Sequence, residues 1–363
     1  MALSPTLEHL RTFAVARSLF APTTLQRAIA KLGFVQADPI RAPARAQDLT
    51  LRHRVKDYRA GDLERRYARL DIDEDFFVNY GFLPSATHAL MHPRAARVKW
   101  TKPRMMKAMA VLEFVRARGA VHPREVDAEF AHGKVTNWFG GSSNASTQLL
   151  DGMHYRGLLR IARREGGIRV YAARTPCEPP ASVAVAMDQL VDVIVNTYAP
   201  LHQRTLSELV LRLRLAAPQW ADARQSALAR AKARLMWAKI DGTTWYWPAG
   251  ENPLSSRHRA DDVVRFLAPF DPVVWDRRRF EAFWGWAYRF EAYTPAPKRV
   301  RGYYALPLLW RDQVIGWGNL GVKDGALRAS IGYVDGPTPT DTGFQAALDD
   351  EIGRMETFLA PRR

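Results

Sequence analysis

Apolar residues near the start of the chain recur at the spacing of an amphipathic helix. Within residues 6–19 they share one helical face, at Leu7, Leu10, Phe13, Ala14 and Ala16. A second helix with a threonine N-cap is expected over residues 23–32. Residues 34–38 then predict a short strand, which Pro39 ends because proline has no N–H to give to a sheet.

Two later stretches share one order of elements, three helices followed by a hairpin. The first is expected to form helices over residues 103–118, 121–130 and 143–155 and two short strands within 158–172. The second is expected to form helices over 182–198, from Thr205 and over 221–237, and a hairpin that turns at Asp241 and Gly242. This is the order of a winged helix, a variant of the helix-turn-helix, so we predict two tandem winged helices.

After Asn252 the pattern changes to short β-like runs, GYYALPLLW and DQVIGWGNL, and a closing helix over 341–358. A β-hairpin is expected around the turn at 295–298. We therefore predict an α+β fold. Its parts are a helix-turn-helix unit over 1–100, winged helices within 101–175 and 181–250, a C-terminal β-rich domain over 251–363, and linkers at 140–143 and 175–180.

The charge of the chain favours a polyanionic partner. Its 53 Lys and Arg exceed its 37 Asp and Glu by 16, so nucleic acid attracts it before any specific contact forms. No apolar run is long enough for a membrane span, and the N-terminal segment lacks the apolar core of a signal peptide. The single cysteine, Cys177, excludes an intramolecular disulfide. We expect a cytoplasmic monomer that associates with the nucleoid when bound to DNA.

One segment, residues 270–309, combines seven basic residues with eleven aromatic ones. Phosphates attract Lys and Arg, and unstacked bases stack on flat aromatic rings, so such a segment suits a nucleic-acid surface. The alternative is the edge of an aromatic core with a solvated basic rim. The segment alone leaves both interpretations open.

Metal chemistry has little support in the sequence, and nucleotide hydrolysis has none. No HExxH motif is present, and His88 and His92 have no Glu between them and no third ligand evident nearby. We therefore interpret them as surface or capping histidines and expect no metal. No GxxxxGK[ST] loop is present, and the run at 140–143 lacks the lysine that binds phosphate. No cofactor is expected.

A better candidate is Gln36-Ala37-Asp38, at the end of the first expected strand. Side chains alternate along a strand, so Gln36 and Asp38 are expected to point to one side and to hold a water between them. Taken alone the pattern is weak. A Gln-x-Asp triplet is common by chance, and an Asp before Pro is usually a turn residue.

Four stretches of the chain resemble the winged-helix DNA glycosylases of the AlkZ and YcaQ type. They are FVQADPIRAPARAQDLTLRHRV, WFGGSSNASTQLLDGMHYRGLLRI, LAPFDPVVWDRRR and YRFEAYTPAPKRVRGYYALPLL, and in this order they span nearly the whole chain. The family's catalytic motif is Gln-hydrophobic-Gln or Gln-hydrophobic-Asp. The resemblance therefore implies that Gln36 and Asp38 are the catalytic pair of a YcaQ-like, Gln-x-Asp member.

The chain departs from the YcaQ-like pattern in two places. Phe76-Phe77-Val78 stands where such members have Trp-x-His, and Gly316-Trp317-Gly318-Asn319 stands where they have Gly-Arg-x-Asp. The second departure removes a charged pair that would support the site.

The resemblance implies a monofunctional DNA N-glycosylase that hydrolyses the N-glycosidic bond of N-alkylated bases, such as N7-alkylguanine, and unhooks interstrand crosslinks. Asp38 would take the proton of a water that Gln36 orients. The implied partner is double-stranded DNA with alkylated bases or crosslinks. The residues expected to bind it, several of them on a DNA-probing hairpin over 293–304, are Arg41, Arg45, Arg278, Lys298, Arg299, Arg301, Tyr303 and Tyr304.

Two other classes of function stay open. A non-catalytic winged-helix DNA-binding protein, either a regulator or a lesion sensor, has the same charge and the same elements. In such a protein a carboxylate like Asp38 facing DNA would only repel its phosphates. An RNA-binding protein also fits the charge and the aromatic residues.

Overall fold

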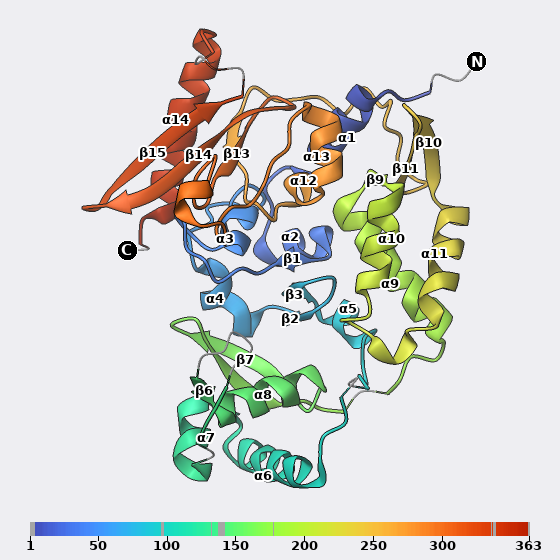
Figure 1. Ribbon diagram of the computed structural model, residues 1–363, viewed down its shortest axis with the longest axis vertical. Coiled ribbons are helices and arrows are strands. Elements are labelled where there is room, and N and C mark those ends of the chain that lie inside the picture. The colour runs from blue at the N-terminus through green and yellow to red at the C-terminus, as the bar shows by residue number, and fades with distance from the viewer. Residues whose placement is uncertain are drawn as a thin grey trace. The chain divides into compact units, whose positions relative to one another are not determined.

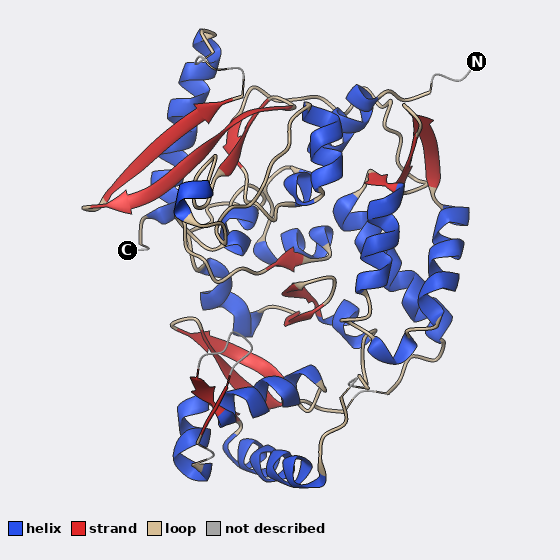
Figure 2. Ribbon diagram, viewed as in Figure 1, coloured by secondary structure: helices blue, strands red, loops and turns tan. Residues whose placement is uncertain are grey.

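A computed structural model of the protein describes residues 4–95, 98–131, 133–136, 142–176, 178–334, 336 and 339–361. The fold is mixed α+β, with several small antiparallel sheets (Figure 2). The chain divides into two compact units. The first comprises Met1–Asp62, Val191–Val210 and Leu228–Arg363, and the second comprises Leu63–Leu190 and Leu211–Ala227. Cys177 and part of the expected linker at 140–143 lie outside the described residues.

The N-terminal elements of the first unit lie where the hydrophobic pattern predicts them. They are α1, Leu7–Ser18, α2, Leu25–Leu32, and the short strand β1, Val35–Gln36, and they are followed by α3, Ala46–Leu51. Thr24 caps α2 by accepting a hydrogen bond from a backbone N–H of the first turn. Gly33 ends α2 with a φ of 76°, a conformation that side chains with a Cβ rarely adopt.

Four antiparallel strands near the end of the chain form a curled half-barrel, in the order β12-β13-β14-β15. They are β12, Val264–Phe266, β13, Leu306–Trp310, β14, Gln313–Lys323, and β15, Ala326–Tyr333. Buried residues alternate with more exposed ones along most of β14, as expected for a sheet covered on one face. The closing helix α14, Thr342–Leu359, packs against this sheet (Figure 1). The predicted strands and closing helix are confirmed.

Two short helices precede β13 and pack against α1. They are α12, Pro272–Trp275, and α13, Arg277–Trp284. Their apolar side chains form a buried cluster with residues from α1 and the sheet, among them Val15, Phe280, Trp286 and Leu309. This cluster fixes α12 within the first unit.

The β-hairpin predicted around residues 295–298 is wrong. In the fully described stretch between α13 and β13 there are turns and one short 3-10 helix, η3, Ala296–Lys298, but no strand. Pro295 and Pro297 have no N–H to give to a strand ladder. The backbone N–H groups of residues 300–302 are bound by the carboxylate of Glu291 rather than by a partner strand. We refer to residues 291–304 as the Glu291 loop.

The second unit contains the first of the two predicted helix and hairpin stretches, and both the helices and the hairpin are confirmed. Its helices are α6, Lys102–Arg118, α7, Pro123–Phe130, and α8, Ala145–Tyr155. They pack on a sheet of order β4-β8-β7, built from Ala120–Val121, Ile168–Ala173 and Leu159–Glu165. A short pair, β5, Lys134–Thr136, and β6, Ser142–Asn144, lies between α7 and α8 in the chain.

Smaller elements precede α6. They are α4, Asp62–Arg66, the 3-10 helix η1, Tyr67–Arg69, the antiparallel strands β2, Ile72–Phe76, and β3, Tyr80–Pro84, and the helix α5, Ser85–Ala89. Strand β2 is unusual because its acidic residues Asp73, Glu74 and Asp75 are all buried. Buried carboxylates need partners, and β2 therefore marks a place where charged groups gather.

The second predicted stretch also has the expected order. It comprises α9, Val183–Tyr198, β9, Leu201–His202, α10, Gln203–Arg212, the 3-10 helix η2, Pro218–Trp220, α11, Ala223–Arg234, β10, Met236–Ile240, and β11, Thr243–Trp247. The hairpin turns at Asp241 and Gly242, with φ angles of 47° and 76°. The residues of this stretch are shared between the two units. Among the described helices, none has the length and apolar character that a membrane span requires.

Candidate functional site

Gln36 ends strand β1, and an indole from a distant part of the chain holds its side chain. Its Oε1 accepts a hydrogen bond from Nε1 of Trp275 at 2.9 Å. Trp275 is the last residue of α12, and its ring centroid lies 4.9 Å from that of Tyr198. The indole therefore directs the oxygen of the Gln36 amide toward itself and fixes the orientation of that amide. This contact could not be predicted from the sequence.

A buried ion pair fixes α12. Asp271 caps the helix through a backbone N–H, and its two carboxylate oxygens accept from the guanidinium of Arg54 at 2.7 and 2.9 Å. Both side chains are fully buried. Arg54 also donates to two backbone carbonyls. Because a bidentate charged pair has a well-defined geometry, Trp275 is presented to Gln36 from a rigid support.

Asp38 lies two residues beyond β1 and is 8% exposed. Its Oδ1 accepts from the backbone N–H of Ile40 at 2.9 Å, so the residue also forms the turn that its position before proline predicts. Burial raises the pKa of Asp38, although the hydrogen bond from Ile40 acts to lower it. Among the described residues no Lys or Arg forms an ion pair with it. This carboxylate therefore has a higher proton affinity than an ordinary aspartate.

Tyr304 was predicted to contact DNA, but its side chain is buried. It is 2% exposed, and this burial does not fit a direct contact with DNA. Its hydroxyl forms no hydrogen bond with the residues that the structure describes. Burial, followed by the negative charge of Asp38, raises the pKa of Tyr304 above its usual value. The structure thus brings a protonated hydroxyl within electrostatic range of Asp38, which the sequence did not predict.

The Glu291 loop carries an exposed basic and aromatic surface. Lys298 is exposed, and Tyr303 is 44% exposed. The guanidinium of Arg299 lies 5.0 Å from the centroid of the Tyr303 ring, a cation–π distance. Lys298 is thus the chain neighbour of a cation–π pair, a combination of charge and ring that suits a nucleic-acid surface, and the DNA contacts predicted for Lys298, Arg299 and Tyr303 stay a prediction.

Arg301 is held inward instead. Its guanidinium lies 4.8 Å from the ring of Trp286 and 5.4 Å from the ring of Trp317. The carboxylate of Glu291, 6% exposed, accepts from the backbone N–H groups of residues 300–302 at 3.0, 2.8 and 3.2 Å. Burial acts to raise the pKa of Glu291, but these three N–H donors hold it below its usual value. The carboxylate is therefore a permanent anchor for the backbone of the loop.

Three other predicted DNA contacts also belong to the first unit. Arg41 is exposed, and Arg45 is half-buried at the N-cap of α3. Arg278, on α13, pairs with Glu208 at 2.8 Å, and the two side chains are 46% and 52% exposed. Exposed ion pairs of this kind contribute little stability, so a phosphate can compete with Glu208 for Arg278.

Comparison with known proteins places the chain in a family. Residues 29–358 match the family described as DNA glycosylase AlkZ-like. The chain belongs to the AlkZ-like DNA glycosylase family. Among solved structures it is similar to the Streptomyces sahachiroi DNA glycosylase AlkZ, with a TM-score of 0.63, 13% identity, and coverage of 99% of this chain and 100% of that chain. At this identity the match shows the fold. Family membership implies DNA as the substrate and supports a glycosylase, which is a hydrolase.

In this AlkZ-like chain Trp317 and Asn319 stand where the YcaQ-like pattern has Arg and Asp, and both contact Arg301. Asn319 Nδ2 donates to the backbone carbonyl of Arg301 at 2.6 Å, a bond that a carboxylate cannot donate. Trp317 contributes one of the two rings that face the Arg301 guanidinium. Trp317 and Asn319 therefore both help to hold Arg301 of the Glu291 loop in place.

The other departure lies in the second unit and is mostly buried. Phe77 and Val78 are fully buried, whereas Phe76 is 39% exposed and meets the rings of Tyr80 and Tyr155 edge-on. The side chains of these three residues pack within the second unit. Val78, which cannot titrate, stands where the YcaQ-like pattern has a histidine.

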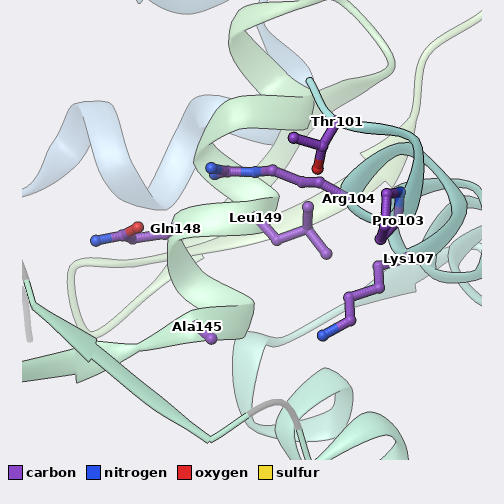
Figure 3. Close-up of a pocket in the computed structure, with 7 residues that line it drawn as sticks. All are labelled: Thr101, Pro103, Arg104, Lys107, Ala145, Gln148 and Leu149. Carbon is purple, nitrogen blue, oxygen red and sulfur yellow. The ribbon is translucent and has the colours of Figure 1, made fainter. Parts of the chain in front are cut away.

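The AlkZ-like chain has a basic pocket in its second unit (Figure 3). The pocket has a volume of about 320 Å³ and is lined by residues of α6 and α8 and the segment before α6: Thr101, Pro103, Arg104, Lys107, Ala145, Gln148 and Leu149. The guanidinium of Arg104 lies 5.2 Å from the ring of Trp100. Two cations and an amide around an open hollow are suited to a phosphate.

His88 and His92 are each 1% exposed, so the prediction of surface histidines is wrong. Asp75 on β2 is a third potential ligand, which the sequence did not indicate. Its Oδ2 lies 2.9 Å from Nε2 of His88 and 3.3 Å from Nε2 of His92, and the two Nε2 atoms are 3.1 Å apart. The other oxygen of Asp75 accepts from the guanidinium of Arg94 at 3.0 Å.

The charges of this cluster follow from its partners. Burial acts to raise the pKa of Asp75, but Arg94 and hydrogen bonds from the two imidazoles hold it well below the usual range. Burial lowers the pKa of His92 to about 4. At neutral pH the cluster therefore contains a permanent carboxylate and an uncharged His92 side chain.

Proposed function

We propose that the protein is a monofunctional DNA glycosylase of the Gln-x-Asp, YcaQ-like branch, and that it hydrolyses the N-glycosidic bond of N-alkylated purines such as N7-alkylguanine. One observation carries the proposal. Asp38 is buried, has a raised pKa and lacks an ion-pair partner among the described residues, and it lies two positions from Gln36, whose amide Trp275 orients. A proton acceptor beside a fixed amide suits the activation of a water.

The reaction needs little from the enzyme beyond placement and charge. Alkylation at N7 makes the purine cationic, so the base departs with both electrons of the bond to C1′ and becomes neutral. The oxygen of a water held by Gln36 forms the new bond to C1′, and Asp38 takes the proton of that water. The negative charge of Asp38 also stabilises the oxocarbenium-like sugar.

DNA is bound through backbone charges and stacking rather than through sequence readout. We interpret the two helix and hairpin stretches as winged helices that contact phosphates. Lys298, Arg299 and Tyr303 of the Glu291 loop add a basic and aromatic contact near a lesion. We extend the proposed substrates to interstrand crosslinks, because a base linked to the other strand cannot be flipped into a closed pocket and must be reached in place.

The test is base release from duplex DNA that contains N7-methylguanine, measured in single turnovers with excess enzyme. Asp38→Asn is expected to slow release by about 10²- to 10⁴-fold, the range of a lost general base. Asp324→Asn is the matched control, because it removes the same charge from an exposed turn between β14 and β15, where Asn also adopts a positive φ. The control is expected to release base at the wild-type rate.

The alternative, a non-catalytic DNA-binding protein, gives a different result in the same experiment. In that case neither the wild type nor Asp38→Asn releases base, while both bind DNA in a salt-sensitive manner. Release that is equally fast in the wild type and in Asp38→Asn would contradict the assignment of Asp38 as the base.

A further inference from the structure

Asp75, His88 and His92 direct three potential ligand atoms at one another in the interior of the second unit. The atoms are one carboxylate oxygen and two imidazole Nε2 atoms, and the triangle that they form has sides of 2.9, 3.1 and 3.3 Å. The imidazole rings are stacked, with centroids 4.3 Å apart and planes inclined by 23°. All three side chains are at least 98% buried.

We propose that Asp75, His88 and His92 bind a divalent transition-metal ion, with Zn²⁺ as the ion to test first. Zinc binds imidazole nitrogen at about 2.0–2.1 Å and carboxylate oxygen at about 2.0–2.2 Å. Ligand atoms on one ion then lie about 3.0–3.3 Å from each other, for octahedral and tetrahedral arrangements respectively. The three sides of the triangle are close to this range, and the three atoms lie within 4.8 Å of one another as one set.

A network of hydrogen bonds explains this arrangement less well. If both imidazoles donated to Asp75, two Nε2–H groups with like partial charges would face each other at 3.1 Å. If only one imidazole carried a proton on Nε2, the lone pair of the other Nε2 would face the carboxylate oxygen of Asp75, at 3.3 Å in the case of His92. Two nitrogen lone pairs that share one cation avoid both repulsions, because the ion holds both at its own bond length.

The surroundings also have features of a metal site. Arg94 donates to Oδ1 of Asp75 at 3.0 Å, which orients the carboxylate and leaves Oδ2 facing the imidazoles. On the far side of the His88 ring, Nδ1 lies 4.0 Å from Oδ2 of Asp73, a second carboxylate that faces the histidine away from the proposed ion. A Cβ at Gly157 would lie 2.7 Å from Nδ1 of His92, so the chain packs closely against this ring.

The proposed ion has a structural role. The three ligands come from β2, from α5 and from the segment that follows α5, so one ion ties three short elements together. Short elements of this kind hold few contacts of their own, and metal binding contributes directly to their folding. The glycosylase reaction proposed above uses no metal, so the two proposals stand or fall separately.

The experiment uses the full-length protein purified without chelator. Its metal content is measured by mass spectrometry, and we expect close to one divalent ion per chain. A sample stripped with chelator is then titrated with Zn²⁺ while its thermal unfolding is followed, and with Co²⁺ while its visible spectrum is recorded. We expect an increase in Tm with Zn²⁺, and visible ligand-field bands that saturate at one Co²⁺ per chain.

Two variants locate the ion. His92→Gln removes one ligand and is expected to weaken Zn²⁺ affinity by more than about tenfold. His154→Gln removes another buried histidine of the same unit, which is not one of the three ligands, and is expected to keep wild-type affinity and stoichiometry. If His92→Gln fails to fold, the Co²⁺ spectrum of the wild type still decides. A wild type that contains no metal, shows no increase in Tm with Zn²⁺ and gives no Co²⁺ bands would overturn the proposal, and so would equal losses in the two variants.

Discussion

Asp38 and Asp75 are both buried aspartates, 8% and 0% exposed, yet their surroundings shift their pKa values in opposite directions. Asp38 has a backbone hydrogen bond and no ion pair with the described residues, so burial raises its pKa. Asp75 faces Arg94 and two imidazoles, which together outweigh the same effect of burial. The partners, and not the degree of burial, decide which of the two carboxylates binds a proton more readily than an ordinary aspartate and which binds it less readily.

The largest expected effect is on the free energy of unfolding, when Asp is replaced by Asn at each of the two positions in separate variants. Asp75→Asn leaves the buried guanidinium of Arg94 without its carboxylate and is expected to lower the free energy of unfolding by about 3–5 kcal/mol. Asp38→Asn removes an unpaired buried charge and keeps an oxygen for the N–H of Ile40, so stability is expected to stay equal or rise. Urea unfolding at pH 7, with chelator present to exclude any metal effect, measures both.

The pH dependence of these differences has opposite signs. The pKa of Asp75 is lower in the folded state, so its carboxylate stabilises the fold above the unfolded pKa of about 3.9 and this contribution is lost as the pH falls toward the folded pKa. The pKa of Asp38 is higher in the folded state, so its ionisation costs stability as the pH rises through that value. Equal destabilisation by both substitutions at pH 7 would refute the contrast between the two sites.

A smaller effect is expected in the pH profile of base release. The single-turnover rate should fall tenfold for each pH unit below the pKa of Asp38, and the midpoint should lie above the ordinary aspartate value of 3.8. Acid also depurinates DNA without enzyme, so the rate with Asp38→Asn is subtracted at each pH. A rate that does not change with pH after this subtraction would show that Asp38 is not the proton acceptor.

The smallest effect is expected from Trp275→Phe, which removes the indole N–H and keeps an aromatic ring. Loss of the hydrogen bond to Gln36 should cost about 0.5–1.5 kcal/mol of transition-state stabilisation, a rate about 2- to 10-fold lower, with unchanged DNA affinity. Trp284→Phe is the matched control, since Trp284 Nε1 donates to the carbonyl of Asp312 at 2.9 Å in the same unit. If both variants slow the reaction equally, the cause is packing and not the orientation of Gln36.

The regular elements of the fold were predictable because their signals are local. The apolar spacing of residues 6–19 and 103–118 identified α1 and α6 to within one residue at most boundaries. The prediction of a hairpin at 295–298 was wrong for an equally physical reason. The N–H groups that a strand ladder needs are bound by Glu291, and no spacing of apolar residues reveals such a side-chain acceptor.

The candidate sites were less accessible because their partners are distant in sequence. Gln36 and Trp275 are 239 positions apart, and only the fold brings them together. Gln36 and Asp38 do not lie on one strand as the alternation of side chains predicted, since β1 ends at Gln36 and Asp38 lies beyond it. His88 and His92 were visible as a pair, but Asp75 lies on another element, so neither their burial nor their third partner followed from spacing.

The carboxylate of Glu291 also has a consequence for the DNA contact that we propose for this loop. By binding three successive N–H groups it settles the path of the loop while the chain folds. The conformational entropy of residues 300–302 is therefore lost during folding and not during DNA binding. A loop ordered in advance favours rapid inspection of many sites, because each encounter with undamaged DNA costs no new ordering and can end quickly.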